Sequence, residues 1–250
     1  MGVNAIYILW LRQLKRFIRK KASIVGAIGQ PIIFLLAFGF GLSPVFAKAG
    51  AGNYIQFLAP GIIVMTVLFT SIFTGLEIIW DKQFGFLKET FVAPVPRYQI
   101  LLGKVLGGAT VAMAQGFLVF IITLFAGFRP VNWLSLPLAF LYLFLVAFLS
   151  SALGASIAAR LEDMQGFPLI FNFVVQPLFY LSGAIFPLDN LPPVLNFITK
   201  INPFSYGVDG LRFAFSGVNI FSPLLSIGVL IGVSLVIIGF GVYQFKKVQL

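Results

Sequence analysis

Cysteine and histidine are absent from this 250-residue chain, and charged residues make up only 10% of it. Without cysteine there is no disulfide framework and no thiolate chemistry. Without histidine the commonest metal ligand and general base is missing. A soluble domain is about a quarter charged, so this chain has too little polar surface to remain in water, and a soluble fold is excluded.

Charge is also missing from the interior of the long apolar stretches, because every Asp and Glu lies at a stretch edge or in a connection. Ionisable groups at membrane depth mark proton relays and ion pathways, so a proton-driven carrier would have nothing to titrate. An intramembrane protease or transferase would also lack its reactive groups at depth. The chain has no Gly-x-x-x-x-Gly-Lys-Ser/Thr loop to cradle a nucleotide, so an ATP-driven motor would be a separate chain.

Long apolar runs dominate what is present, since hydrophobic residues make up 60% of the chain. A membrane-spanning helix needs roughly 20 mainly apolar residues. The sequence therefore predicts an all-α integral membrane protein with a single transmembrane domain over residues 1–250. The six predicted spans are 23–42, 55–76, 105–125, 134–157, 166–186 and 221–243.

The basic residues indicate how the chain is oriented, because Lys and Arg are retained on the cytoplasmic side of a membrane. With the N-terminus inside, most of the 17 Lys and Arg residues fall in inner segments. The exceptions are Lys48, Arg129, Lys200 and Arg212. This predicts a protein of the cell membrane with both termini in the cytoplasm. The net charge of +10 then reflects topology, so the expected partner is the lipid bilayer and no nucleic acid.

The first 22 residues are both basic and periodic. At 100° per residue, Ile6, Leu14 and Phe17 fall within about 40° of Trp10. The basic residues Arg12, Lys15, Arg16 and Arg19 lie between about 140° and 240°. This pattern favours an amphipathic helix in the inner membrane interface, and a basic flank without a helix of its own is the alternative.

Residues 187–217, between the fifth and sixth predicted spans, are interrupted by prolines but still carry many apolar side chains. Irregular backbone at membrane depth is tolerated only where protein or a water-filled cavity covers it. We expect short re-entrant helices that dip back from the outer face, with a plain outer loop as the alternative.

The longest inner connection, residues 77–104, carries an apolar stripe. Phe84, Leu87 and Phe91 recur at helical spacing before two prolines end the pattern, which predicts a helix over about 81–92. Such a stripe could dock a partner protein or rest on lipid, and the periodicity does not distinguish the two.

Polar side chains at the spans are the remaining candidates for function. Glu77 ends an apolar run and either pairs with Arg12 or Arg16 or acts as a simple interfacial anchor. Four amides within the spans either line a substrate path or hydrogen-bond between helices: Gln30, Gln115, Asn172 and Gln176. Small residues that favour close helix packing include Gly107, Gly108, Ser151 and Gly154.

Three groups of residues occur in a characteristic order and spacing. They are Phe57-Leu58-Ala59-Pro60-Gly61; Glu77 followed by Gly85, Ala93-Pro94, Arg97 and Gly103-Lys104; and Ser182-Gly183, Phe186-Pro187, Leu191-Pro192, Asn202-Pro203, Tyr206, Asp209 and Arg212. With these motifs, nearly the whole chain resembles the type-2 ABC export permeases, the membrane half of drug and polysaccharide exporters.

The resemblance implies an amphipathic N-terminal helix, a coupling helix after the second span and re-entrant helices before the sixth. Docking to an ATPase would use Phe84, Gly85, Leu87, Lys88, Glu89 and Phe91. Where the family often reads Gly-Thr-Leu-Glu, this chain reads Gly85-Phe86-Leu87-Lys88, and Glu89 comes one position later. The re-entrant segment would include Ser182, Gly183, Pro187, Asn202, Pro203, Tyr206, Asp209 and Arg212.

The resemblance also implies a functional assembly. Two permeases, as a homodimer or with a paralogue, would face each other over two ABC ATPase subunits that bind ATP and Mg. This chain would hold no cofactor and catalyse nothing. Its expected role is efflux of an amphipathic or apolar compound, drug-like or lipid-like, as in multidrug resistance. Export of polysaccharide or a lipid-linked glycan is the alternative within the family, and a secondary carrier or a membrane scaffold is an alternative outside it.

Overall fold

The computed structural model describes residues 2–19, 21–48, 53–86, 90, 95–161, 163–188 and 191–247, and these residues form helices and connections without any β-strand. Five helical stretches are long and apolar enough to cross a membrane: Ile28–Phe46, Tyr54–Gln83, Arg97–Phe125, Trp133–Arg160 and Pro223–Phe245. A further apolar stretch, Gly166–Tyr180, is shorter. The protein is therefore an all-helical, multi-pass membrane protein, and the count of six spans stays a prediction.

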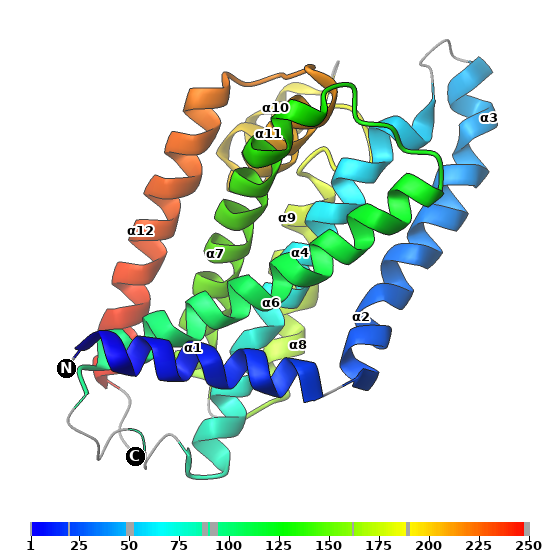
Figure 1. Ribbon diagram of the computed structural model, residues 1–250. Coiled ribbons are helices and arrows are strands. Elements are labelled where there is room, and N and C mark those ends of the chain that lie inside the picture. Colours follow the sequence, from blue (N-terminus) through cyan, green and yellow to red (C-terminus); the bar gives the residue numbers. More distant parts are fainter. Residues whose placement is uncertain are drawn as a thin grey trace.

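The centre of the bundle is α4 (Tyr54–Gln83), which packs on α6 (Arg97–Phe125) and α7 (Leu136–Arg160) (Figure 1). Helix α12 (Pro223–Lys247) packs on the other side of α7. Both helices run past the second and third predicted spans, since α4 continues to Gln83 and α6 begins at Arg97. They continue past the first charged residues because the charges at these helix ends, near α1, find partners within the protein, as described below.

The first predicted span lies at the edge of the bundle (Figure 1). It is a continuous helical stretch made of α2 (Lys21–Phe34), a wider π-helical turn (Leu35–Phe40) and α3 (Gly41–Lys48). The predicted fifth span has a similar build: α8 (Gly166–Ile170), a π-helical turn (Phe171–Val175) and α9 (Gln176–Tyr180). Here the helix ends six residues before the predicted boundary at 186, in a turn where Gly183 has a φ of 79°.

The basic N-terminal segment is a helix, α1 (Gly2–Arg19), which lies across one end of the bundle and packs along α6 (Figure 1). Glycines in α6 allow this approach: a Cβ added at Gly103 would overlap Leu9, and one at Gly107 would overlap Gln13. Trp10 Nε1 donates to Thr110 Oγ1 at 3.0 Å. The apolar side of α1 therefore rests partly on protein. The C-terminal end of α12 lies at the same end of the bundle as α1 (Figure 1).

Small residues bring α4 and α7 together, as predicted. A Cβ added at Gly75 would overlap the carbonyl of Gly154, and one at Gly154 would overlap the carbonyl of Ile72. A Cβ at Gly108 would collide with side chains of Thr74 and Ser151. Close backbone approach of this kind replaces the hydrophobic driving force that is missing between helices in lipid.

At the opposite end of the bundle from α1, the connection after α9 folds into α10 (Pro193–Ile201) and α11 (Pro203–Ser216) (Figure 1). Helix α11 is largely buried and packs on α4, α7 and α12. A short helical turn (Trp133–Ser135) precedes α7 at this end. The segment 187–217 thus contains two short helices, and their re-entrant position in a membrane stays a prediction.

Candidate functional site

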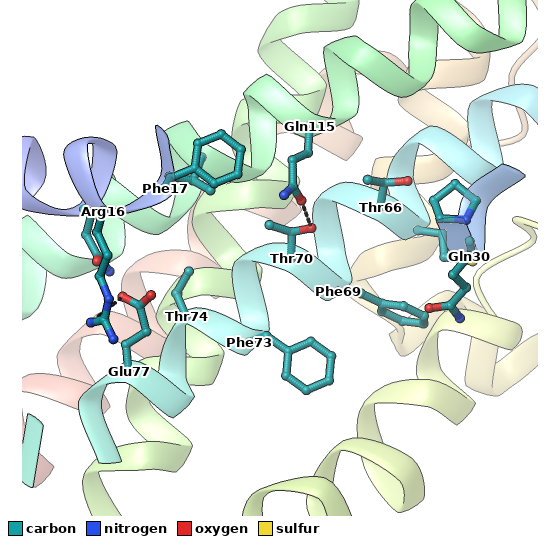
Figure 2. Close-up of a pocket in the computed structure, with 14 residues that line it drawn as sticks. Arg16, Phe17, Gln30, Thr66, Phe69, Thr70, Phe73, Thr74, Glu77 and Gln115 are labelled. Carbon is teal, nitrogen blue, oxygen red and sulfur yellow. Dashed lines mark hydrogen bonds and ion pairs between the residues drawn. The ribbon is translucent and has the colours of Figure 1, made fainter. Parts of the chain in front are cut away.

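A cavity of about 290 Å³ lies between α1, α2, α4 and α6 (Figure 2). Helix α4 contributes one of its faces, because residues three or four positions apart project on the same side. That face consists of Thr66, Phe69, Thr70, Phe73, Thr74 and Glu77. In Figure 2, Arg16 and Glu77 lie at one end of the cavity and Gln30 lies at the other, with Gln115 between them.

The charged end of the cavity is formed by α1 and α4. Arg16 Nη1 lies 3.6 Å from Glu77 Oε2, and the Arg16 guanidinium lies over the Trp80 ring at 5.6 Å. Glu77 Oε2 is buried and accepts no hydrogen bond from any residue that the structure describes. The structure thus places Glu77 beside the first helix, as one of the two predicted alternatives requires, and leaves one of its oxygens without a donor.

Next to this end, a buried charge cluster joins α1, α4 and α6. Asp81 forms an ion pair with Lys104, and the two side chains are each 8% exposed. Arg12 Nη2 lies 3.4 Å from the other Asp81 oxygen. Sequence reasoning missed Asp81, although its place four residues after Glu77 puts both acids on one face of α4, toward the basic helix.

The amides predicted for a substrate path separate into two pairs. Gln115 is buried; its Oε1 accepts a hydrogen bond from Thr70 (Figure 2), and the described residues provide no acceptor for its amide nitrogen. Gln30 lines the same cavity from α2. Asn172 and Gln176 lie outside it: Asn172 is exposed, and Gln176 Nε2 donates to Tyr180 Oη at 2.8 Å.

The predicted docking segment begins differently from expected. Residues 81–83 belong to α4, and Gly85, with a φ of 79°, forms a left-handed turn after them. The predicted start of a separate helix at 81 is therefore wrong, because Asp81 is held inside the bundle. Phe84 is 71% exposed and Phe86 is 49% exposed. The other predicted docking residues, Leu87, Lys88, Glu89 and Phe91, lie outside the described residues.

Both ends of this segment are tied to neighbouring helices. Lys82 Nζ donates to the carbonyls of Ala158, Ala159 and Leu161, at 3.1, 2.6 and 3.1 Å, at the C-terminal end of α7. Arg97 Nη1 donates to the Phe245 carbonyl of α12 at 2.7 Å. Cations suit these positions because the last carbonyls of a helix lack partners within it.

At the opposite end, the family-like residues converge on one junction. Arg212 Nη2 donates to the Gly183 carbonyl at 2.9 Å, and its guanidinium lies 4.0 Å from the centroid of the Phe57 ring. A Cβ at Gly61 would overlap the backbone of Ala184. These contacts hold the start of α4 and helix α11 against the turn after α9.

Further residues of the predicted outer segment stabilise the backbone around α11. Asn202 donates to the Leu178 carbonyl at 2.6 Å and caps α11 by accepting from the Phe204 N–H, with Pro203 at the first helical turn. Tyr206 Oη donates to the Lys200 carbonyl at 2.7 Å, and Ser182 Oγ donates to the Phe179 carbonyl at 2.6 Å. Pro187 is partly exposed in the turn that follows. These contacts hold the fold and lie away from the cavity.

Asp209 joins α11 to the start of α12. Its two carboxylate oxygens accept hydrogen bonds from the backbone N–H groups of Ile220 and Phe221, at 2.8 and 2.9 Å. Burial raises the pKa of the Asp209 carboxyl, and these two hydrogen bonds and the nearby Arg212 partly oppose the rise.

Known proteins identify the chain's family. The family model described as ABC-2 type transporter matches residues 4–216, which include every residue that lines the cavity and all of α10 and α11. The chain belongs to the ABC-2 type transporter family. It is therefore the membrane subunit of a transporter, a permease, and this family in general implies an ABC ATPase partner.

The permease is similar to several curated transport proteins. It is 32% identical over 226 residues to the putative transport permease ycf38 of Pyropia yezoensis, covering 87% of this chain and 76% of the relative. It is 28% identical over 230 residues to the inner membrane transport permease YadH of Escherichia coli K12, covering 91% and 89%. Nodulation protein J of Rhizobium meliloti is 27% identical over 215 residues, covering 84% and 79%.

Proposed function

We propose that the permease is the membrane-spanning subunit of an ATP-driven ABC exporter that moves an amphipathic or apolar compound, drug-like or lipid-like, out of the cytoplasm. The observation that carries the proposal is the cavity beside α1. Phe17, Phe69 and Phe73 give it apolar walls, while three glutamines and an Arg–Glu pair give it polar groups. An amphipathic compound in the inner membrane interface would meet this end of the bundle first.

ATP and Mg would bind to separate partner subunits, and this chain would hold no cofactor. The segment after α4 is the proposed docking surface, because Phe84 and Phe86 are exposed at the α1 end of the bundle. Leu87, Lys88, Glu89 and Phe91 would continue this surface. Its ties to α7 and α12 would pass a movement of the ATPase to both helices.

In the proposed topology, the permease is a single domain in the cell membrane with both termini in the cytoplasm. Support comes from the basic residues Lys82, Arg97, Lys104 and Arg160, which lie at the helix ends nearest α1, since cytoplasmic segments carry the excess of Lys and Arg. The stretch Gly166–Tyr180 would be the fifth of six spans, and α10 and α11 would be the re-entrant helices.

We further propose that two permeases pair, as a homodimer or with a paralogue, along the Gly166–Tyr180 stretch. Asn172 is exposed on a surface it shares with the exposed side chains of Leu169 and Phe173. A polar amide facing lipid is unfavourable, whereas one facing a second subunit or a water-filled path is not. Asn172 and Gln176 would then line a path between the two subunits.

Export of a polysaccharide or a lipid-linked glycan is the alternative within the family. A glycan needs many hydrogen-bonding partners, and the cavity has three threonines. Thr66 and Thr74, however, already donate to carbonyls of their own helix at 3.0 and 2.6 Å. The apolar walls and the shortage of free hydroxyls favour an amphipathic compound.

The test is to purify the tagged permease from its native membrane in mild detergent, identify the subunits that co-purify, and reconstitute the complex in proteoliposomes. We expect an ABC ATPase, and ATP-dependent movement of a fluorescent amphiphile. Phe84→Asp should abolish co-purification of the ATPase. Val131→Asp is the matched control, because Val131 is 77% exposed in the connection before α7 at the other end. Flux that needs a gradient and no ATP would instead indicate a secondary carrier, and partners without flux a scaffold.

A further inference from the structure

Glu77 Oε2 points to the chemistry of a ligand, because it faces the Arg16 guanidinium at 3.6 Å but accepts no hydrogen bond from a described residue. A buried polar atom without a hydrogen-bond partner is costly, and in the described part of the chain no donor reaches Glu77 Oε2. The residue lines the cavity, so a molecule in the cavity can supply the missing donor. A donor that is also positively charged would form the stronger, charge-assisted hydrogen bond with the carboxylate.

The cations near Glu77 make no hydrogen bond to this oxygen. Arg16, at 3.6 Å, is beyond hydrogen-bonding distance and also lies over the Trp80 ring. Arg12 and Lys104 are paired with Asp81. Glu77 Oε2 can therefore accept a hydrogen bond from a charged donor beside Arg16, in the way that Asp81 pairs with two cations, Arg12 and Lys104.

The walls suit an apolar, partly aromatic body. Phe17, Phe69 and Phe73 come from two different helices and face the same space (Figure 2). Aromatic faces also attract a cation that lies above them. The volume of about 290 Å³ is at the small end of the range for ligand pockets, which limits the occupant to one compact body with one polar head.

We propose that the cavity between α1, α2, α4 and α6 of a single permease subunit is a binding site for a lipophilic amine. The protonated amine donates to Glu77 Oε2, and the apolar body lies against the phenylalanine side chains and Val111. The amide nitrogen of Gln115 is placed to donate to an acceptor on the body. The proposal rests on the proposed function in one respect, since it names the substrate class and a loading site for the exporter.

The experiment measures equilibrium binding without nucleotide, on the purified permease with the subunits that co-purify with it. The probes are three dansyl-labelled alkyl chains of equal length that end in a primary amine, a hydroxyl or a carboxylate. We expect the amine to bind about tenfold more tightly than the alcohol, which corresponds to ~1.4 kcal/mol, and the carboxylate to bind most weakly. Dansyl emission reports entry into an apolar site.

Three variants locate the site. Glu77→Gln should weaken binding of the amine about tenfold and leave binding of the alcohol nearly unchanged. Asp163→Asn is the control, because it removes an exposed carboxylate outside the cavity, and it should change neither affinity. Val111→Trp should narrow the cavity and block binding of all probes. Co-purified subunits and a single gel-filtration peak establish that each variant is folded.

Equal affinity for amine and alcohol in the wild type, or an unchanged amine affinity in Glu77→Gln, would overturn the assignment. Amine binding that survives in a folded Val111→Trp protein would overturn the location. The two proposals fail separately: ATP-driven transport of an amphiphile without amine selectivity removes this site and leaves the exporter. Selective amine binding by a permease that has no ATPase removes the exporter and leaves the site.

Discussion

Replacing Asp81 is the most direct test of how the α1 end of the permease is held together. Asp81 and Lys104 form an ion pair with side chains that are each 8% exposed, whereas the second cation on Asp81, Arg12, is 40% exposed. In Asp81→Asn, Lys104 is left in a buried place without the adjacent carboxylate. Breaking a buried pair in this way costs roughly 3–5 kcal/mol of unfolding free energy.

The reverse change should cost less. In Lys104→Met, Asp81 keeps Arg12 at 3.4 Å, so we expect a loss of about 1–3 kcal/mol, the range for a buried group that loses one partner. The double variant should be more stable than the sum of the single losses predicts, by about 0.5–3 kcal/mol.

The assay is reversible unfolding by sodium dodecyl sulfate in mixed micelles, followed by the fluorescence of the protein's three tryptophans. It gives an unfolding free energy for the wild type, both single variants and the double variant. If Lys104→Met costs as much as Asp81→Asn, or if the two losses add, then the cluster is not organised around Asp81 and the reasoning fails.

Three further predictions concern the contacts around α11, at the end of the bundle opposite α1, and use thermal unfolding in detergent. Gly61→Ala should destabilise the protein by about 1–3 kcal/mol, because its Cβ would overlap the backbone of Ala184. Gly232→Ala is the control: Gly232 has open space around it, so this change should be neutral or slightly stabilising. Equal effects of the two changes would contradict the close packing at Gly61. Arg212→Lys should cost about 1–3 kcal/mol, since lysine cannot both lie flat on the aromatic ring and reach the carbonyl; an unchanged melting temperature would contradict this. Burial raises the pKa of the Asp209 carboxyl above its ordinary 3.8. The stability gained from protonated Asp209 is therefore complete below pH 3.8 and is lost as the pH rises through the pKa of the folded state. Asp209→Asn should flatten this part of the curve of stability against pH, and an unaltered slope would refute the assignment.

The helical type of the long apolar stretches could be predicted because each such stretch has only one stable form in a membrane, a helix that satisfies its own backbone. The ends of the helices could not be predicted in this way. A prediction from hydropathy ends a span at its first charged residues, near Glu77 and Lys104, but these side chains find partners across α1, α4 and α6. Their charges are therefore compatible with continued helix, and α4 and α6 extend beyond the predicted limits.

The candidate site was partly predictable for a similar reason. An amide within an apolar run is noticeable in a sequence, so Gln30 and Gln115 could be named, but the same signal selected Asn172 and Gln176, which lie elsewhere. What separates the pairs is how α1 and α2 pack against α4 and α6. That packing depends on small residues such as Gly103 and Gly107, whose effect is tertiary.

The ion pairs of the described residues all lie at the α1 end of the permease, and this difference between its two ends bears on where it can move. At the opposite end, Arg212, Asn202 and Asp209 bond to backbone groups fixed in space, so a shift would break several bonds without forming others. At the α1 end, the backbone contacts of Lys82 and Arg97 are joined by ion pairs at and beside one end of the cavity, and such pairs can re-form in a second arrangement. An ATPase docked after α4, as proposed, would act through the ties of Lys82 and Arg97 on α7 and α12. Alternating conformations biased by nucleotide would then open or close the cavity beside Glu77 while the opposite end acts as the fixed point.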